Sequence, residues 1–133
     1  MKERILIYDK EVAGHHVEYL IHLFKYISSQ QIQKNRYLFL LNHKVEKILN
    51  NKLFKGIHVI YIPEEENEKF ISEPNLIKRS IKEWRYLMNL IQQQGNIKKL
   101  FFLKIDLYQY VIGKNNDIDV KIGGILFSNY SHL

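Results

Sequence analysis

The amino-acid sequence predicts an α/β fold in which helices cover both faces of a mainly parallel sheet. Apolar runs of strand length recur along the chain, and most are continuous in hydrophobicity rather than alternating, as expected for strands that are covered on both faces. Segments with helical periodicity lie between these runs. Because this alternation favours parallel strands joined by right-handed crossovers, we expect a Rossmann-like three-layer sandwich with about five strands.

Five apolar runs are the expected strands. The first four are nearly continuous, which indicates burial on both faces of the sheet. The fifth follows a polar turn with the sequence "GKNNDID". The expected strands cover residues 5–8, 37–41, 57–62, 100–105 and 120–127.

Three segments with helical periodicity are the expected helices. In the first, Val17, Leu20 and Phe24 recur at helical spacing and form an apolar stripe for the core. In the third, Pro74 suits the first turn and Gly95 suits the end. The expected helices cover residues 15–29, 43–55 and 74–94.

Residues 63–75, between the third strand and the third helix, differ in composition from the rest of the chain. They hold five glutamates and both prolines. Their length exceeds the usual strand-to-helix connection of about two to six residues. We therefore expect a loop here that is mobile, functional or both.

Composition excludes several classes of protein. With 133 residues, of which 46% are hydrophobic, the chain is expected to form one globular domain. It has no cysteine, which removes disulfides, thiolate metal sites and cysteine nucleophiles. No window reaches the roughly 18 apolar residues of a membrane-spanning helix. The net charge is +6, but Lys and Arg are spread along the chain, which disfavours a nucleic-acid-binding patch.

The turn between the first strand and the first helix is the main candidate site. Ligands of open parallel sheets bind at the carboxyl ends of the strands, where Gly14 is expected to lie. Gly14 allows close approach to the backbone, and the free N–H groups of a helix start attract anions, which suits a phosphate or diphosphate. The motif G-x-G-x-x-G is absent, which disfavours a Rossmann dehydrogenase. The alternative is that Gly14 only makes the turn.

Two adjacent histidines follow this glycine. His15, Glu18 and His22 share one helical face, but His15 and His22 are separated by about 10 Å along the helix axis. That separation is too large for a shared metal ion, so we expect no metal. His15 or His16 would instead hydrogen-bond a sugar hydroxyl or a phosphate, or act as a base. The alternative is an exposed histidine pair at a helix start.

Other strand ends add acids and aromatic rings. Asp9 and Asp106 both follow strands at the same edge, where two carboxylates bind sugar hydroxyls or assist proton transfer. Tyr108 and Tyr110 come just after Asp106, and aromatic rings at a strand end stack on sugars or bases. For Asp9, the alternative is capping of the turn or helix.

Three stretches resemble the N-terminal half of bacterial GT-B glycosyltransferases of the group-1 type. They are "GHHVEYL" at 14–20, "FFLKIDLYQY" at 101–110 and "GGILFSNY" at 123–130. In such enzymes two Rossmann-like domains face each other across a cleft. The N-terminal domain mainly binds the acceptor, and the C-terminal domain holds the nucleotide-sugar donor. The resemblance implies that Gly14 contacts the donor diphosphate, that His15 and His16 lie at the reaction centre, and that the Glu-rich segment shapes the acceptor site.

We therefore expect residues 1–133 to be the acceptor-binding half of a glycosyltransferase whose donor domain is missing. The end of the chain soon after the fifth strand, with no helix left to cover it, fits such a fragment. Half a cleft does not hold a donor in reactive geometry, so we expect no activity from this chain alone. The expected partners are a nucleotide-sugar donor, bound through the missing domain, and a glycan or lipid-linked acceptor. We expect no cofactor and no nucleic acid, and a cytoplasmic location with contact at the inner face of the membrane left open.

The predicted site residues divide by role. The expected catalytic residues are His15, His16 and Asp106, and Gly14 is expected to bind the donor phosphate. The expected acceptor contacts are Asp9, Glu18, Glu64 and Tyr108. The alternative functions are a stand-alone nucleotide- or phosphate-binding regulatory module and, less favoured, a basic nucleic-acid-binding domain.

Overall fold

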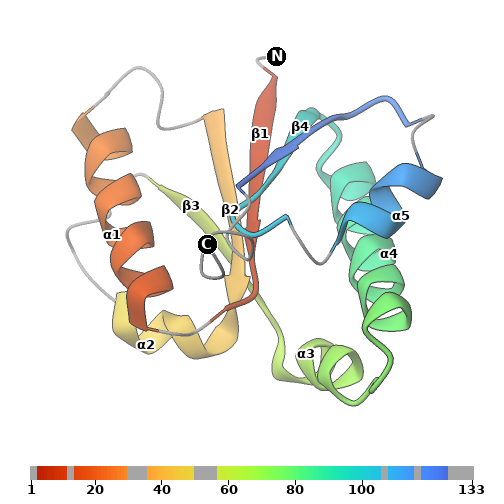
Figure 1. The fold of residues 1–133 in the computed structure, drawn as a ribbon. Coiled ribbons are helices and arrows are strands. Elements are labelled where there is room, and N and C mark those ends of the chain that lie inside the picture. Colours follow the sequence, from red (N-terminus) through yellow and green to blue (C-terminus); the bar gives the residue numbers. More distant parts are fainter. Residues whose placement is uncertain are drawn as a thin grey trace, which may run out of the picture.

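The computed structural model describes residues 3–11, 14–29, 36–49, 57–105, 108–115 and 118–125, with the side chains of the first helix described from Val17 onward. The strands are β1 (Arg4–Asp9), β2 (Tyr37–Asn42), β3 (His58–Ile62), β4 (Ile97–Phe102) and β5 (Lys121–Gly124). The helices are α1 (Gly14–Ser29), η2 (His43–Val45), α2 (Glu46–Leu49), α3 (Glu64–Ile71), α4 (Leu76–Gln94) and α5 (Gln109–Lys114). Figure 1 shows their arrangement.

All paired strands of the sheet are parallel, and their order is β3-β2-β1-β4-β5. β1 is central, and its Ile7 lies between Phe39 of β2 and Phe101 of β4. The chain builds outward from β1 through β2 and β3, and then returns to the other side of β1 for β4 and β5. The carboxyl ends of β1 and β4 therefore form the topological switch point, where open α/β sheets bind ligands.

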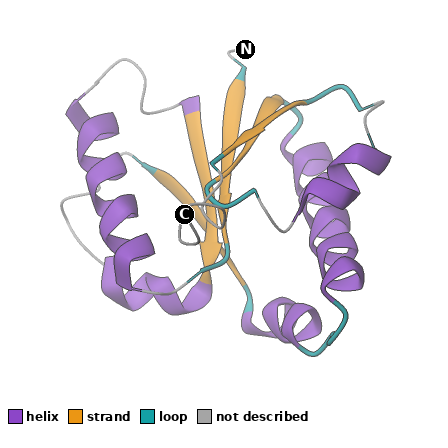
Figure 2. Cartoon of the chain, in the orientation of Figure 1, coloured by secondary structure: helices purple, strands orange, loops and turns teal. Residues whose placement is uncertain are grey.

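The sheet separates two layers of helices (Figures 1 and 2). On one face lie α1 and α2, and Phe24 of α1 packs with Ile7 in the first hydrophobic core. On the other face lie α3, α4 and α5, and Trp84 and Leu87 of α4 pack with Leu6 in the second. Burial on both faces explains why the strands read as continuous apolar runs. The predicted Rossmann-like three-layer sandwich with five parallel strands is confirmed.

Residues 63–75, predicted as a loop, contain helix α3, so that prediction was wrong. Three glutamates occupy the first turn of α3, where negative charge interacts favourably with the positive end of the helix dipole. Phe70 packs into the core beneath α4, and Asn67 is buried. Phe70 is the only buried apolar residue among the eight residues of α3, so the segment shows little helical periodicity. The composition of residues 63–75, rich in Glu and Pro, therefore suggested a loop.

Helix α5 and the start of β4 also differ from expectation. β4 begins at Ile97 rather than at residue 100. The prediction began too late because the exposed Lys98 and Lys99 interrupt the apolar run at the amino end of the strand. α5 was not predicted, since its six residues are too few to show a helical period. Its Val111 nevertheless packs into the core on the α4 face.

Two other predicted elements are observed in part. The expected helix over 43–55 is present as η2 and α2, up to Leu49, and residues 50–55 lie outside the described residues. The expected strand over 120–127 is observed as β5, and residues 126–127 lie outside the described residues.

Gly124 at the end of β5 lies where a side chain has no room. A Cβ there would be 2.6 Å from the Cβ of Ile105 and 2.9 Å from the carbonyl oxygen of Phe102. We expect Gly124→Val to lower the free energy of unfolding by about 1–3 kcal/mol, the usual cost of overpacking, in urea denaturation. Gly113→Ala in α5 is the matched control, because nothing lies within 4 Å of a Cβ there and alanine favours a helix by roughly 0.5–1 kcal/mol. Equal stability of the two variants would contradict this account.

Candidate functional site

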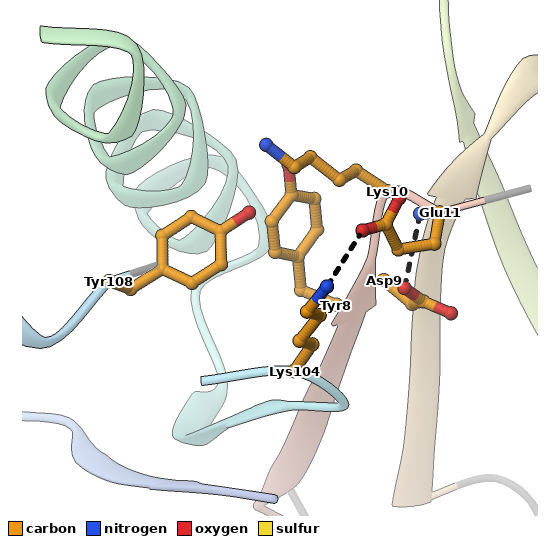
Figure 3. Close-up of a pocket in the computed structure, with 6 residues that line it drawn as sticks. All are labelled: Tyr8, Asp9, Lys10, Glu11, Lys104 and Tyr108. Carbon is orange, nitrogen blue, oxygen red and sulfur yellow. Dashed lines mark hydrogen bonds and ion pairs between the residues drawn. The ribbon is translucent and has the colours of Figure 1, made fainter. Parts of the chain in front are cut away.

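The switch point between β1 and β4 carries a small hollow lined by charged residues and tyrosines (Figure 3). It forms because the chain after β1 leads to α1 on one face, whereas the chain after β4 leads to α5 on the other. Its volume is about 10 Å³, which is room for about one water molecule. We call it the switch-point hollow, and it is lined by Tyr8, Asp9, Lys10, Glu11, Lys104 and Tyr108.

Asp9, the last residue of β1, lines this hollow, and its carboxyl group is turned away from the ring of Tyr108 (Figure 3). The residue is only 3% exposed, and its Oδ1 accepts a hydrogen bond from the backbone N–H of Glu11 at 3.1 Å. Burial raises the pKa of Asp9 to about 6; the Glu11 hydrogen bond opposes this rise, the Glu11 charge adds to it and the Lys104 charge opposes it. Asp9 therefore caps the turn after β1 and also titrates close to neutral pH.

The two lysines of the switch-point hollow have different environments. Lys104 Nζ lies 3.5 Å from Glu11 Oε1, and the two side chains are 31% and 30% exposed. Such a partly exposed pair contributes little to stability, so a ligand charge can replace one partner at small cost. Lys10 instead turns inward, and its Nζ lies 2.9 Å from Oε2 of Glu83 in α4.

Glu83 is the centre of a buried polar group behind the hollow. Its Oε1 accepts hydrogen bonds from the hydroxyls of Tyr8 and Tyr108, both at 2.5 Å, while Oε2 pairs with Lys10. Burial raises the pKa of both tyrosines well above the ordinary value, so both remain protonated donors at neutral pH. We call these four residues the Glu83 cluster.

The structure brings two of the predicted acceptor residues together. Asp9 and Tyr108 both line the switch-point hollow. Tyr108 is 3% exposed, stacks on Phe102 with ring centroids 4.5 Å apart, and donates its hydroxyl to Glu83. Any contact of Tyr108 with an acceptor must therefore use the ring edge in the wall of the hollow, and its role stays a prediction.

The other predicted residues do not line the hollow or lie outside the described residues. Glu18 is exposed on α1, and Glu64 is exposed at the start of α3, after the edge strand β3 and two strands away from β1. Gly14 begins α1 at the same sheet edge as the hollow. Asp106 and the side chains of His15 and His16 lie outside the described residues.

Sequence reasoning missed Lys10, Glu11, Lys104 and Glu83. The first three flank predicted residues but form no motif of their own. A signal for Glu83 was present, because it shares the buried face of α4 with Ser80, Trp84 and Leu87. An acid on such a face is rarely buried without a partner, and its presence indicates a specific polar contact.

The arrangement is suited to holding a hydroxyl group near neutral pH. A carboxyl group with a pKa close to the working pH accepts hydrogen bonds and protons efficiently, and Lys104 at the mouth offers a positive charge. Among the residues that the structure describes, no group of three His, Asp or Glu side chains is placed to hold a metal ion. Within the described residues no helix is both long and apolar enough to cross a membrane.

Asp9 makes stability depend on pH in a specific direction. Its pKa rises from 3.8 to about 6 on folding, so the folded protein keeps a proton that the unfolded chain releases between these values, and stability falls as pH rises through this range. We expect Asp9→Asn to remove this fall. At pH 8 its free energy of unfolding, measured by urea denaturation, should exceed that of the wild type by about 3 kcal/mol.

Asp119→Asn is the control, because Asp119 is fully exposed and its contact with the Lys98 ammonium at 3.7 Å is a surface ion pair that contributes little to stability. Its stability should run parallel to that of the wild type from low to high pH. If Asp9→Asn also ran parallel to the wild type, Asp9 would have an ordinary pKa in the folded protein.

Comparison with protein-family models, with curated proteins and with solved structures finds no match to this chain.

Proposed function

We propose that this chain is the acceptor-binding domain of a glycosyltransferase that moves a sugar from a nucleotide-sugar donor to a glycan or lipid-linked acceptor. The observation that carries the proposal is the buried carboxyl group of Asp9 at the switch point of a Rossmann-like sheet. Ligands of such sheets bind at this edge. A carboxyl group that titrates near neutral pH is suited to hold the hydroxyl that attacks the donor.

The positions of the three glycosyltransferase-like stretches support the proposal. The first, residues 14–20, forms the start of α1, the helix that follows β1 in the chain. The second, residues 101–110, runs from the end of β4 past Lys104 to α5, and the third, residues 123–130, starts at the end of β5. Because β1, β4 and β5 are neighbours in a parallel sheet, three stretches that are far apart in sequence begin at one edge.

The size of the hollow constrains how an acceptor would bind. Room for about one water molecule admits a single hydroxyl, so the acceptor lies across the mouth with that hydroxyl in the hollow that Asp9 lines. Lys104 is then available to an anionic group of the acceptor, because its ion pair with Glu11 is partly exposed and weak. Gly14 at the start of α1 would face the donor diphosphate. With a lipid-linked acceptor, the enzyme would work at the inner face of the membrane.

The proposal requires a second domain that holds the donor. A single domain positions only one of two reactants, and the rate advantage of orientation needs both. We therefore expect no transfer by the 133-residue chain. The alternative is a stand-alone nucleotide- or phosphate-binding module, and the free N–H groups at the start of α1 are the feature that such a module would use.

The test begins with the coding frame beyond the codon for Leu133. We expect the frame to continue into a second α/β domain, and the complete product to transfer sugar from one of a panel of UDP-, GDP- and ADP-linked sugars. The 133-residue chain should transfer none. A stop codon at this point, together with binding of UDP or inorganic phosphate to the chain alone, would replace the transferase proposal with the stand-alone module.

A further inference from the structure

The Glu83 cluster is costly for the protein to maintain. A carboxylate that is 1% exposed loses its hydration, and even a well-paired buried ion pair is often no more stable than an apolar replacement of similar size. The members of the cluster also come from three separate parts of the chain, namely the end of β1 with the residue after it, the middle of α4 and the residue before α5. Stability alone therefore gives a weak reason for an acid at this position of α4.

The cluster holds the residues on both sides of Asp9. Successive side chains of a strand point to opposite faces, and Tyr8 and Lys10 both reach Glu83 on the α4 face. Asp9, between them, is directed to the opposite side, and Figure 3 shows its carboxyl group turned away from the ring of Tyr108. The backbone of the same segment is held as well, because Lys10 O accepts a hydrogen bond from Asn42 Nδ2 at 3.0 Å.

From these contacts we propose that Glu83 is the positioning residue of the switch-point hollow. By binding Tyr8 and Lys10, Glu83 sets the direction of the Asp9 carboxyl group. It thereby keeps the hydrogen bond that Asp9 accepts from the Glu11 backbone N–H well aligned. Glu83 itself is too deeply buried to touch a ligand at the mouth. The inference rests on the proposed function, because it assigns Glu83 a task in holding the acceptor hydroxyl through Asp9.

The Glu11 amide gives a direct readout of this geometry in the 133-residue chain. Its N–H donates to Asp9 Oδ1, so its nitrogen and proton NMR shifts should titrate with Asp9, at a midpoint of about 6 in the wild type. In Glu83→Gln the side chain keeps its size but loses the ion pair with Lys10. We expect the amplitude of the Glu11 titration to fall at least about two-fold, because hydrogen bonds weaken steeply when misaligned.

Two further variants distinguish a positioning role of Glu83 from a general loss of stability of the domain. Ser80→Ala removes another buried polar group from α4, one whose Oγ donates to Ile77 O at 2.7 Å within the helix, and it should leave the Glu11 titration unchanged. Tyr8→Phe removes one hydrogen bond to Glu83 without changing any charge, and it should lower the amplitude by a smaller factor. Tyr8→Phe also decides the question if Glu83→Gln does not fold.

Each outcome bears on the inference. A full Glu11 titration in both Glu83→Gln and Tyr8→Phe overturns the positioning role and leaves the proposed function intact. A reduced amplitude in both, with Ser80→Ala unchanged, supports it. In the complete enzyme Glu83→Gln should then lower kcat while KM for the donor stays constant. A wild-type enzyme that transfers no sugar would remove the proposed function, and the NMR result would still decide what Glu83 holds in place.

Discussion

Phe102→Ala is expected to lower the free energy of unfolding by about 3–5 kcal/mol. Phe102 is fully buried at the end of β4, where its ring stacks on Tyr108 and meets the ring of Tyr8 edge-on, with centroids 5.9 Å apart. Removal of the ring leaves a cavity and also breaks both aromatic pairs. Native domains are stable by only about 5–15 kcal/mol. This single change should therefore raise the fraction of unfolded molecules strongly near physiological temperature.

Urea denaturation of Phe102→Ala beside Tyr110→Ala measures the effect. Tyr110 lies in α5 with half of its surface exposed, and its ring contacts only the Lys114 ammonium among the aromatic and cation contacts of the described residues. The control should therefore lose less than about 1 kcal/mol. Comparable losses in the two variants would mean that the ring of Phe102 is not part of the packed core between the hollow and α4.

Under the proposed function, Gly14→Val is expected to reduce sugar transfer by the complete enzyme by at least about 100-fold. α1 begins at Gly14, five residues after the last residue of β1 and at the same sheet edge, and the free N–H groups of a helix start are where a phosphate is held. A β-branched side chain there blocks the close approach that glycine allows. The measurement is kcat/KM for the donor, with circular dichroism to confirm that the fold is retained.

Ser29→Val is the matched control for this change. It adds the same side chain to the same helix, at the end away from the carboxyl edge of the sheet, and removes only the hydrogen bond from Ser29 Oγ to Tyr26 O. Transfer by this variant should equal that of the wild type. If Gly14→Val were also fully active, Gly14 would have no role in donor binding and its glycine would only serve the turn.

The fold was predictable because its strongest signals are local. Each strand with two covered faces is a continuous apolar run, and α1 and α4 repeat apolar residues at helical spacing, so the alternation of elements could be read along the chain. The position of Asp9 at the carboxyl edge follows from the same reading, because it comes directly after the first apolar run. α3 and α5 escaped detection because eight and six residues with few buried side chains show no clear period.

What the sequence determined by itself is therefore the α/β class, the positions of most elements and the sheet edge at which Asp9 and Gly14 lie. Only the tertiary structure decided which side chains meet there. Tyr8 and Glu83 are 75 residues apart, and Tyr108 and Glu83 are 25 apart, and they meet because β4 pairs with β1 and places α4 and α5 on the same face. Contacts of this kind depend on strand order and packing, for which neighbouring residues in the chain carry no local signal.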